Sequence, residues 1–371
     1  MDKLRFGIIG LGNIGVVHAD TLLAGKVARG ELTAVASSSP AKRELWAGRG
    51  VQVFSTAAEL LESRAVDAVI IATPHLQHLE LGIAAFKAGV HVLMEKPIAA
   101  HKADAEKLLA AHRLNPKILF GCMYQKRVEP CFQKIRALVQ GGALGKIVRV
   151  NWIITDWFRT EAYYASGGWR ATWAGEGGGV LLNQCLHNLD LLQWILEMPR
   201  SLRGFCQLGH FHRIEVEDSV TAYLEWANGA NGVFVSSTGE APGTNRFEIA
   251  GTKGLLVLEH NRLTFTRNET DMLEFSRTAT HGFVKPAAHT EDIDCAKVES
   301  PHTLVTQNFV NAVLDGEPLI APGAEGMYAL ELANAIVLSS LLNQTVELPL
   351  DGAAWEKKLN GLIASSKRAS G

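Results

Sequence analysis

Three glycines near the start of the chain have the spacing of a phosphate-binding turn. The segment Gly10-Leu11-Gly12-Asn13-Ile14-Gly15 follows an apolar run at 5–10 and opens a helix that we predict over 14–23. At such a junction the glycines let the backbone turn and approach a pyrophosphate, and the helix N-terminus offers N–H groups to its oxygens. The motif therefore predicts a dinucleotide site with contacts from Gly10, Gly12, Asn13, Ile14 and Gly15.

The end of the second predicted strand bears on which dinucleotide is bound. Enzymes that use NAD usually place an acid there, whereas this stretch reads Val35-Ala36-Ser37-Ser38-Ser39-Pro40. Hydroxyl groups from Ser37 and Ser38, with Lys42 and Arg43 nearby, suit a 2′-phosphate better. The sequence thus favours NADP slightly over NAD. The alternative is that these serines merely cap the helix that follows.

Lys96 is a candidate for proton transfer. It follows an apolar strand predicted over 91–94, at the carboxyl end of a parallel strand, where such folds place their ligands. A free lysine has a pKa near ~10.4, so proton abstraction requires burial or a neighbouring cation that lowers this pKa. Otherwise the ammonium group polarises the substrate oxygen.

A second candidate group lies in a helix that we predict over 180–196. Asn183, His187 and Asp190 have the spacing i, i+4 and i+7, which puts them on one helical face. A histidine has an ordinary pKa near ~6.5, so His187 is the natural general acid or base of this group. His187 and Asp190 alone cannot form a metal site, and we expect no metal.

The segment before this helix is rich in aromatic and arginine residues. Aromatic rings suit stacking on sugar faces, and guanidinium groups can hold a carboxylate, phosphate or sulfonate with two hydrogen bonds. The alternative for the arginines is salt bridging at a domain interface. We predict substrate contacts from Asn183, Asp190, Arg159, Trp169, Arg170 and Trp173.

The elements that position these residues change in kind near residue 121. Before it, runs such as Val69-Ile70-Ile71 alternate with helical stretches, which predicts βαβ units and a parallel sheet. After it, strands follow one another from 201 to 267, with a hairpin signal at Asn228-Gly229. We predict a loop over 268–300 and two closing helices, over 303–314 and 325–342. The expected domains are an α/β dinucleotide-binding domain, 1–121, and an α+β domain, 122–371, for substrate binding and oligomerisation.

Composition excludes several classes of function. The 371 residues are 47 % apolar and 20 % charged with a net charge of −2, which gives no electrostatic case for nucleic acid or an anionic membrane. No apolar stretch approaches the ~20 residues of a membrane span. The five cysteines form no CxxC pair, so we expect neither a zinc site nor a disulfide framework. These features predict a cytoplasmic protein with reduced cysteines.

Taken together, the motifs resemble the Gfo/Idh/MocA family of oxidoreductases. Gly10–Gly15 with His18, Ala72-Thr73-Pro74-His75, Glu95-Lys96-Pro97, and Gly177-Gly178-Gly179 followed by His187 and Asp190 occur in the order and spacing of that family. The resemblance implies an N-terminal Rossmann domain and a second domain whose large open, mainly antiparallel sheet often builds homodimers or homotetramers. Catalysis is then expected from Lys96 and His187. The resemblance also implies further cofactor contacts from Thr73, Pro74, His75, Glu95, Lys96 and Gln125, and a substrate contact from Tyr124.

The family's typical substrates are pyranoses, inositols and their derivatives. We therefore expect hydride transfer between NAD(P) and a secondary alcohol or ketone of such a molecule. Asn183 departs from the family pattern, since many of its dehydrogenases have Asp four residues before the histidine. Asn binds substrate but cannot ionise, which leaves Lys96 and His187 as a pair. Two alternatives stay open. One is an NAD-dependent glycoside hydrolase that works by transient oxidation, elimination, hydration and reduction; the other is a non-catalytic ligand sensor on the same fold.

Overall fold

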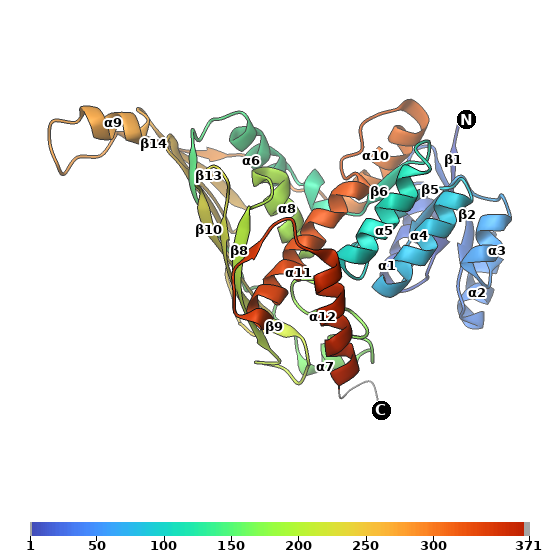
Figure 1. The fold of residues 1–371 in the computed structure, drawn as a ribbon. Coiled ribbons are helices and arrows are strands. Elements are labelled where there is room, and N and C mark those ends of the chain that lie inside the picture. Colours follow the sequence, from blue (N-terminus) through green and yellow to red (C-terminus); the bar gives the residue numbers. More distant parts are fainter. Residues whose placement is uncertain (1, 367–371) are drawn as a thin grey trace. The chain divides into compact units, whose positions relative to one another are not determined.

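The computed structural model describes residues 2–366 of the chain and contains two compact units (Figure 1). The first unit comprises residues up to 128 together with 299–330 and 352–356, and the remaining residues form the second unit. Each unit is therefore discontinuous in the sequence. The division at residue 121 stays a prediction about folding domains, because a compact unit need not be a domain that folds alone.

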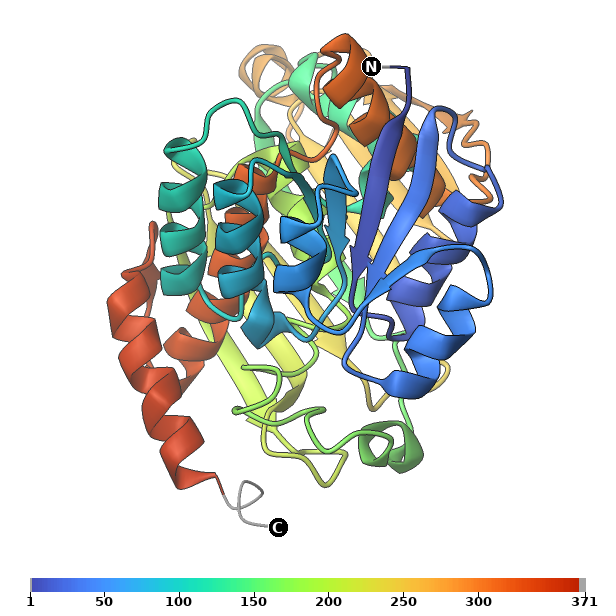
Figure 2. The same cartoon turned by 90° about the vertical axis from the view of Figure 1, so that its right-hand side faces the viewer.

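A six-stranded parallel sheet forms the centre of the first unit (Figure 2). The strand order among the described residues is β3-β2-β1-β4-β5-β6, the doubly wound arrangement that the alternating pattern predicts. Side chains such as Val69 and Ile70 are fully buried, as expected for strands covered on both faces. The strands are β1 (Leu4–Ile9), β2 (Gly30–Ala36), β3 (Gln52–Phe54), β4 (Ala68–Ile71), β5 (His91–Met94) and β6 (Phe120–Cys122).

Helices from both ends of the chain cover this sheet. Phe309 of α10 packs with Phe6 of β1, the ring centroids 6.3 Å apart, so a C-terminal helix completes the core of the first unit. Figure 2 shows α4 and α5 side by side. The helices are α1 (Asn13–Leu23), α2 (Pro40–Ala47), α3 (Ala57–Glu62), α4 (His78–Lys87), α5 (Lys102–Arg113) and α10 (Pro301–Asp315), with short 3₁₀ turns η1 (His75–Gln77), η2 (Gln125–Val128) and η3 (Gly323–Glu325).

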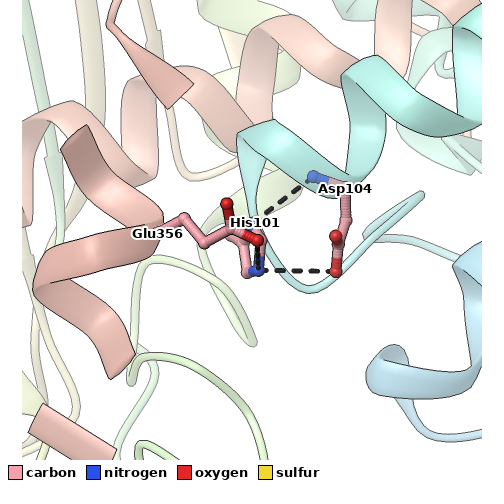
Figure 3. Close-up of side chains that lie close together, drawn as sticks. All are labelled: His101, Asp104 and Glu356. Atoms are coloured by element: carbon pink, nitrogen blue, oxygen red, sulfur yellow. Dashed lines mark hydrogen bonds and ion pairs between the residues drawn. The ribbon is translucent and has the colours of Figure 1, made fainter. Parts of the chain in front are cut away.

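His101 caps helix α5 within a small cluster of charged side chains (Figure 3). Its Nδ1 accepts the Asp104 N–H at 3.4 Å, and its Nε2 lies 3.4 Å from Asp104 Oδ2 and 4.0 Å from Glu356 Oε1. Lys107 Nζ lies 3.1 Å from each of these two carboxylates. It is the one group of three histidine or acidic side chains with metal-ligand proximity among residues 2–366. Because the ammonium group already pairs with both acids, we interpret the cluster as a salt-bridged helix cap.

A nine-stranded sheet dominates the described part of the second unit. Its order is β14-β13-β12-β11-β7-β10-β9-β8-β15, and every pair is antiparallel except β10 with β7. The predicted hairpin at Asn228-Gly229 joins β9 to β10, whose residues Glu225 and Asn231 are paired. The strands are β7 (Ile147–Ile154), β8 (Ser201–Leu208), β9 (Glu217–Glu225), β10 (Asn231–Ser237), β11 (Asn245–Gly251), β12 (Gly254–Glu259), β13 (Arg262–Asn268), β14 (Ala288–Ile293) and β15 (Val346–Glu347). The predicted fold class, a parallel α/β domain followed by an α+β domain with a mainly antiparallel sheet, is confirmed.

Helices line one face of this sheet. Phe132 of α6 packs 6.0 Å from the ring of Trp152 in β7, and the backbone of α11 at Ile336 approaches Gly204 of β8. The helices with residues in this unit are α6 (Pro130–Gln140), α7 (Glu161–Ala165), α8 (Leu186–Leu196), α9 (Met272–Thr278), α11 (Gly326–Leu342) and α12 (Gly352–Ser365). The other face exposes Ile153, Phe205 and Tyr223. Contact between copies of the chain at this face, which the family resemblance implies, stays a prediction.

Three expectations about the second half of the chain are wrong. The region 268–300 contains α9 and β14 instead of a loop. The sequence of β14 has no apolar periodicity, and this strand forms because its backbone pairs with β13. A third closing helix, α12, was missed. Cys131 and Cys295 form a disulfide, which no spacing rule could detect because 164 residues separate them. Among the described residues, no helix is both long and apolar enough to span a bilayer.

Candidate active site

Three loops that carry predicted cofactor residues lie along one edge of the parallel sheet. Ile9 pairs with Ile71, and Ile71 pairs with Met94, so β1, β4 and β5 end level with one another. The residues that follow these ends are Gly10, Ala72 and Glu95. Ligands bind at the carboxyl ends of parallel strands. The fold therefore brings together the glycine turn, the Thr73-Pro74-His75 loop and the Glu95-Lys96-Pro97 loop.

The glycine turn has the space and the conformation that a bound pyrophosphate requires. Gly10 has a φ of +97°, which disfavours any side chain, and a Cβ on Gly15 would lie 1.9 Å from the Gly10 carbonyl oxygen. By contrast, a Cβ on Gly12 would meet no described atom within 4 Å, so this side of the turn is open. Thr73 Oγ1 is buried and has no hydrogen-bond partner among the described residues. The open turn, the helix N-terminus and this hydroxyl group fit a dinucleotide.

The serines at the end of β2 serve partly as caps. Ser39 Oγ accepts the Lys42 N–H at 3.5 Å at the start of α2, as the alternative interpretation predicts, and Ser37 Oγ accepts the Ser39 N–H at 3.3 Å. Two cations nonetheless lie here. Lys42 Nζ donates to the Leu11 carbonyl oxygen at 2.6 Å, and Arg43 donates to the Ser37 carbonyl oxygen at 2.7 Å. Positive charge thus borders both the glycine turn and the strand end.

A buried acid supports the backbone at Lys96. The Lys96 side chain is half-buried, and its N–H donates to Glu95 Oε2 at 3.3 Å. The other oxygen of Glu95 lies 2.7 Å from His18 Nε2, and the His18 ring contacts the His302 ring of α10. Burial opposes ionisation of Glu95, but the hydrogen bond and charge of His18 outweigh it and hold the pKa of this acid below its ordinary value. Glu95 thus holds the backbone from which the Lys96 side chain extends.

Two histidines near this edge have roles that the sequence did not predict. His302 lies more than 200 residues beyond the Rossmann motifs, so only the return of α10 to this unit brings it to His18. His78 is fully buried, with Nδ1 2.7 Å from the Pro97 carbonyl oxygen and Nε2 2.9 Å from that of Thr73. Burial lowers the pKa of His78. This ring joins the loop after β4 to the loop after β5.

In the second unit, a fully buried acid holds the turn that leads into α8. Glu217 Oε1 accepts the N–H groups of Gly179 and Leu181 at 2.8 and 3.2 Å. A Cβ on Gly179 would lie 2.0 Å from the Glu217 carbonyl oxygen, so the close contact of this turn with β9 requires glycine. Burial raises the pKa of Glu217 to about 7. The only sequence signal for this role is an acid in an otherwise alternating strand.

The predicted Asn183, His187 and Asp190 face needs one correction. Asn183 lies in the turn before α8 and not on the helix, because the Cys185 N–H bonds to the Val180 carbonyl oxygen, five residues back, and interrupts the helical ladder. His187 and Asp190 lie on α8 and are 7 % and 1 % exposed. Asp190 Oδ1 accepts the Gln193 side-chain amide at 3.1 Å, and the Asn183 amide nitrogen donates to Glu176 Oε1.

The aromatic segment places two guanidinium groups around one tyrosine ring. The Arg170 Cζ lies 4.8 Å from the Tyr163 ring centroid and the Arg159 Cζ lies 5.2 Å from it, and Arg170 also donates to the Tyr163 hydroxyl at 3.1 Å. Neither arginine has a carboxylate at salt-bridge distance among the described residues of the second unit. Salt bridging at a domain interface stays the alternative. The positive charges of Arg159 and Arg170 lie beside the rings of Tyr163 and the exposed Trp169.

Other predicted substrate residues are differently situated. Trp169 is 39 % exposed and adjoins Arg170, whereas Trp173 is buried and its N–H donates to Glu215 Oε1 at 2.7 Å. Tyr124 is fully buried in the first unit, where its hydroxyl donates to the Gly326 carbonyl oxygen at 3.4 Å. Substrate contacts from Tyr124 and Trp173 stay predictions.

Comparison with known families decides the class of protein. Residues 4–121 match the oxidoreductase family with an NAD-binding Rossmann fold, and residues 132–257 match the C-terminal domain of the same family. The chain belongs to the Gfo/Idh/MocA family. The resemblance of its motifs and the expected oxidoreductase activity are thereby confirmed, and so is the NAD-binding character of the first domain.

Curated and structural relatives agree with this assignment. The chain is 27 % identical to an inositol 2-dehydrogenase of Rhizobium meliloti, over 91 % of this chain and 96 % of the relative. It is 25 % identical to a myo-inositol 2-dehydrogenase of Thermotoga maritima, over 93 % and 98 %. The WlbA dehydrogenase of Bordetella pertussis, solved with NADH and UDP-GlcNAcA, has a TM-score of 0.78 and 26 % identity, with 94 % of this chain and 100 % of that chain covered.

Proposed function

We propose that this chain transfers a hydride between NAD(P) and a secondary alcohol or ketone of a cyclic, polyhydroxylated molecule, with Lys96 and His187 as its catalytic residues. The observation that carries the proposal is that Lys96 follows β5 at the sheet edge where β1 leads into the glycine turn. An amine and a dinucleotide cradle thus share one edge. The names of the inositol dehydrogenases, and the nucleotide sugar bound by the WlbA relative, support a cyclic polyol as substrate.

The proposed chemistry assigns proton transfer to the protein. The bound nicotinamide supplies the hydride acceptor or donor. In the oxidation direction the neutral Lys96 amine accepts the proton of the substrate hydroxyl as the hydride leaves. In the reduction direction the Lys96 ammonium group donates a hydrogen bond to the carbonyl oxygen, stabilises the negative charge that develops on it, and gives it the proton. Glu95, held by His18, keeps the backbone at Lys96 in place. That His187 acts on the same oxygen follows from the family resemblance alone and stays a prediction.

We further propose that the substrate carries an anionic group. Arg159 and Arg170 flank Tyr163 without a carboxylate partner among the described residues of the second unit, and Trp169 offers an exposed ring beside them. Guanidinium groups in this state suit a carboxylate or phosphate, and the aromatic rings suit a sugar face. We assign Asp190, on α8, and Asn183, in the turn before α8, to contact with the substrate and to its positioning.

A substrate panel tests the proposed function directly. Inositols, anhydrosugars, uronates and aryl glycosides would each be incubated with NAD and with NADP, while nicotinamide absorbance and released aglycone are followed together. We expect a net change in absorbance with at least one non-glycosidic polyol or uronate. Aglycone release without a net absorbance change would instead establish the glycoside hydrolase alternative. Ligand binding without either signal would establish the sensor.

For the cofactor, we propose that the chain accepts NADP as well as NAD, with a slight preference for NADP. Arg43 and Lys42 border the end of β2, and no acid follows Ala36 there to repel a 2′-phosphate. Arg43→Ala is expected to weaken NADP binding about tenfold and NAD binding less than twofold, since a charge-assisted hydrogen bond contributes roughly 1.5–3 kcal/mol. Calorimetric Kd values measure this. Lys117→Ala, an exposed lysine before β6, is the control, and equal losses for both dinucleotides would contradict the preference.

A further inference from the structure

A buried acid outside every sequence motif contacts the predicted substrate residue Asn183. Glu176 lies just before the triple glycine and is only 2 % exposed. Its Oε1 accepts the side-chain amide of Asn183, and its Oε2 accepts the Ala171 backbone N–H at 2.5 Å. One carboxylate thus joins the turn before α8 to the residue that follows Arg170.

The hydrogen bonds of Glu176 define the orientation of the Asn183 amide. Both carboxylate oxygens accept N–H groups, which is the pattern of an ionised acid. Because a carboxylate accepts but cannot donate, the amide nitrogen of Asn183 must point toward it, and the carbonyl oxygen must point elsewhere. A charged acceptor makes this hydrogen bond stronger than one between neutral groups. The amide therefore has one preferred orientation of two.

The same carboxylate supports the arginine segment. Ala171 has a φ of +51°, in the left-handed region that alanine seldom adopts. Its N–H donates to Glu176, and Arg170, its neighbour, has its guanidinium over the rings of Tyr163 and Trp169. An unfavourable backbone conformation persists only where surrounding contacts hold it. Glu176 is one of those contacts.

We propose that Glu176 is a positioning residue for the substrate. It fixes the Asn183 amide so that Asn183 offers its carbonyl oxygen to a substrate hydroxyl, and it restricts substrates to those with a hydrogen-bond donor at that position. This inference rests on the proposed function, because it assumes that Asn183 contacts the substrate.

Exchanging the acid and the amide tests the inference. Glu176→Gln removes the orienting charge, so we expect KM to rise about tenfold with kcat changed less than threefold and dinucleotide Kd unchanged. Asn183→Asp puts a second carboxylate in contact with the buried Glu176 and should lower kcat/KM about a hundredfold. The double variant E176Q/N183D restores one amide–carboxylate hydrogen bond and one charge, and kcat/KM should recover at least tenfold over N183D. A double variant no better than N183D would overturn the proposal.

Control variants separate positioning from folding. Glu215 also accepts a backbone N–H of this segment, that of Trp173, but has no contact with Asn183, so Glu215→Gln should leave KM within twofold. If Glu176→Gln does not fold, Asn183→Ala replaces it as the probe of the same hydrogen bond, and an unchanged KM in that variant would overturn the proposal. Substrate analogues that lack one hydroxyl identify the contact, because the affected analogue should be insensitive to Glu176→Gln.

The two proposals fail in different ways. Absence of any redox turnover in the unaltered protein overturns the proposed function. In that case the same variants are compared by the Kd of a bound polyol, measured by calorimetry with the dinucleotide present. An unchanged KM or Kd in Glu176→Gln, with turnover or binding intact in the unaltered protein, overturns only the role of Glu176.

Discussion

Replacing Lys96 with methionine is expected to lower kcat by about three orders of magnitude, because general acid–base catalysis typically contributes 10²–10⁴-fold. Methionine keeps an unbranched chain of similar width but has neither the charge nor a proton to exchange. The glycine turn and Thr73, which fit the dinucleotide, are untouched by this change. We therefore expect the dinucleotide Kd to stay within about threefold of the unaltered value, a shift below ~1 kcal/mol. Steady-state turnover and calorimetric binding together measure this separation.

A matched lysine shows whether the effect belongs to the site. Lys87 is an exposed lysine in the last turn of α4, and Lys87→Met should leave both turnover and dinucleotide binding unchanged. Turnover of Lys96→Met within tenfold of the unaltered protein would remove Lys96 from the mechanism. Equal loss of turnover and dinucleotide binding would instead assign Lys96 to cofactor binding.

Glu217 is expected to make the unfolding free energy depend on pH. Its pKa is about 7 in the folded chain against an ordinary value of 4.5, because burial disfavours the charged form. The folded state therefore binds more protons than the unfolded state between these two pH values, and stability falls as pH rises through this window. The loss approaches about 3 kcal/mol above pH 7, since each pKa unit corresponds to ~1.4 kcal/mol. Below pH 4.5 this contribution is fully present.

Glu217→Gln should remove that dependence. Glutamine keeps a carbonyl oxygen for the N–H groups of Gly179 and Leu181 and cannot ionise. The free energy of unfolding would be measured in urea at pH 5 and at pH 8. From the lower to the higher pH, we expect the variant to become about 2–3 kcal/mol more stable relative to the unaltered protein. Glu225→Gln, at the other end of the same strand and half-exposed, is the control. A gain below ~1 kcal/mol would mean that Glu217 titrates near its ordinary pKa.

The sequence by itself determined the class of fold and the motifs of the dinucleotide site. Local rules were sufficient there, because β-branched runs such as Val69-Ile70-Ile71 specify buried strands. Gly10 is required by its positive φ, and Gly15 is required by its close contact with the Gly10 carbonyl oxygen. The motif that contains Lys96 directly follows its strand, so its place at the sheet edge followed from the alternation of strands and helices.

Tertiary structure alone decided the supporting groups. His302 reaches His18 and Glu217 reaches Gly179 through contacts between segments that lie far apart in the sequence. Glu176 reaches Asn183 within one irregular turn, which has no periodicity to reveal the contact. The strand β14 and the Cys131–Cys295 disulfide likewise depend on distant partners. Local sequence encodes backbone preference and burial, whereas the partner of a buried polar group is set by which segments the fold packs together.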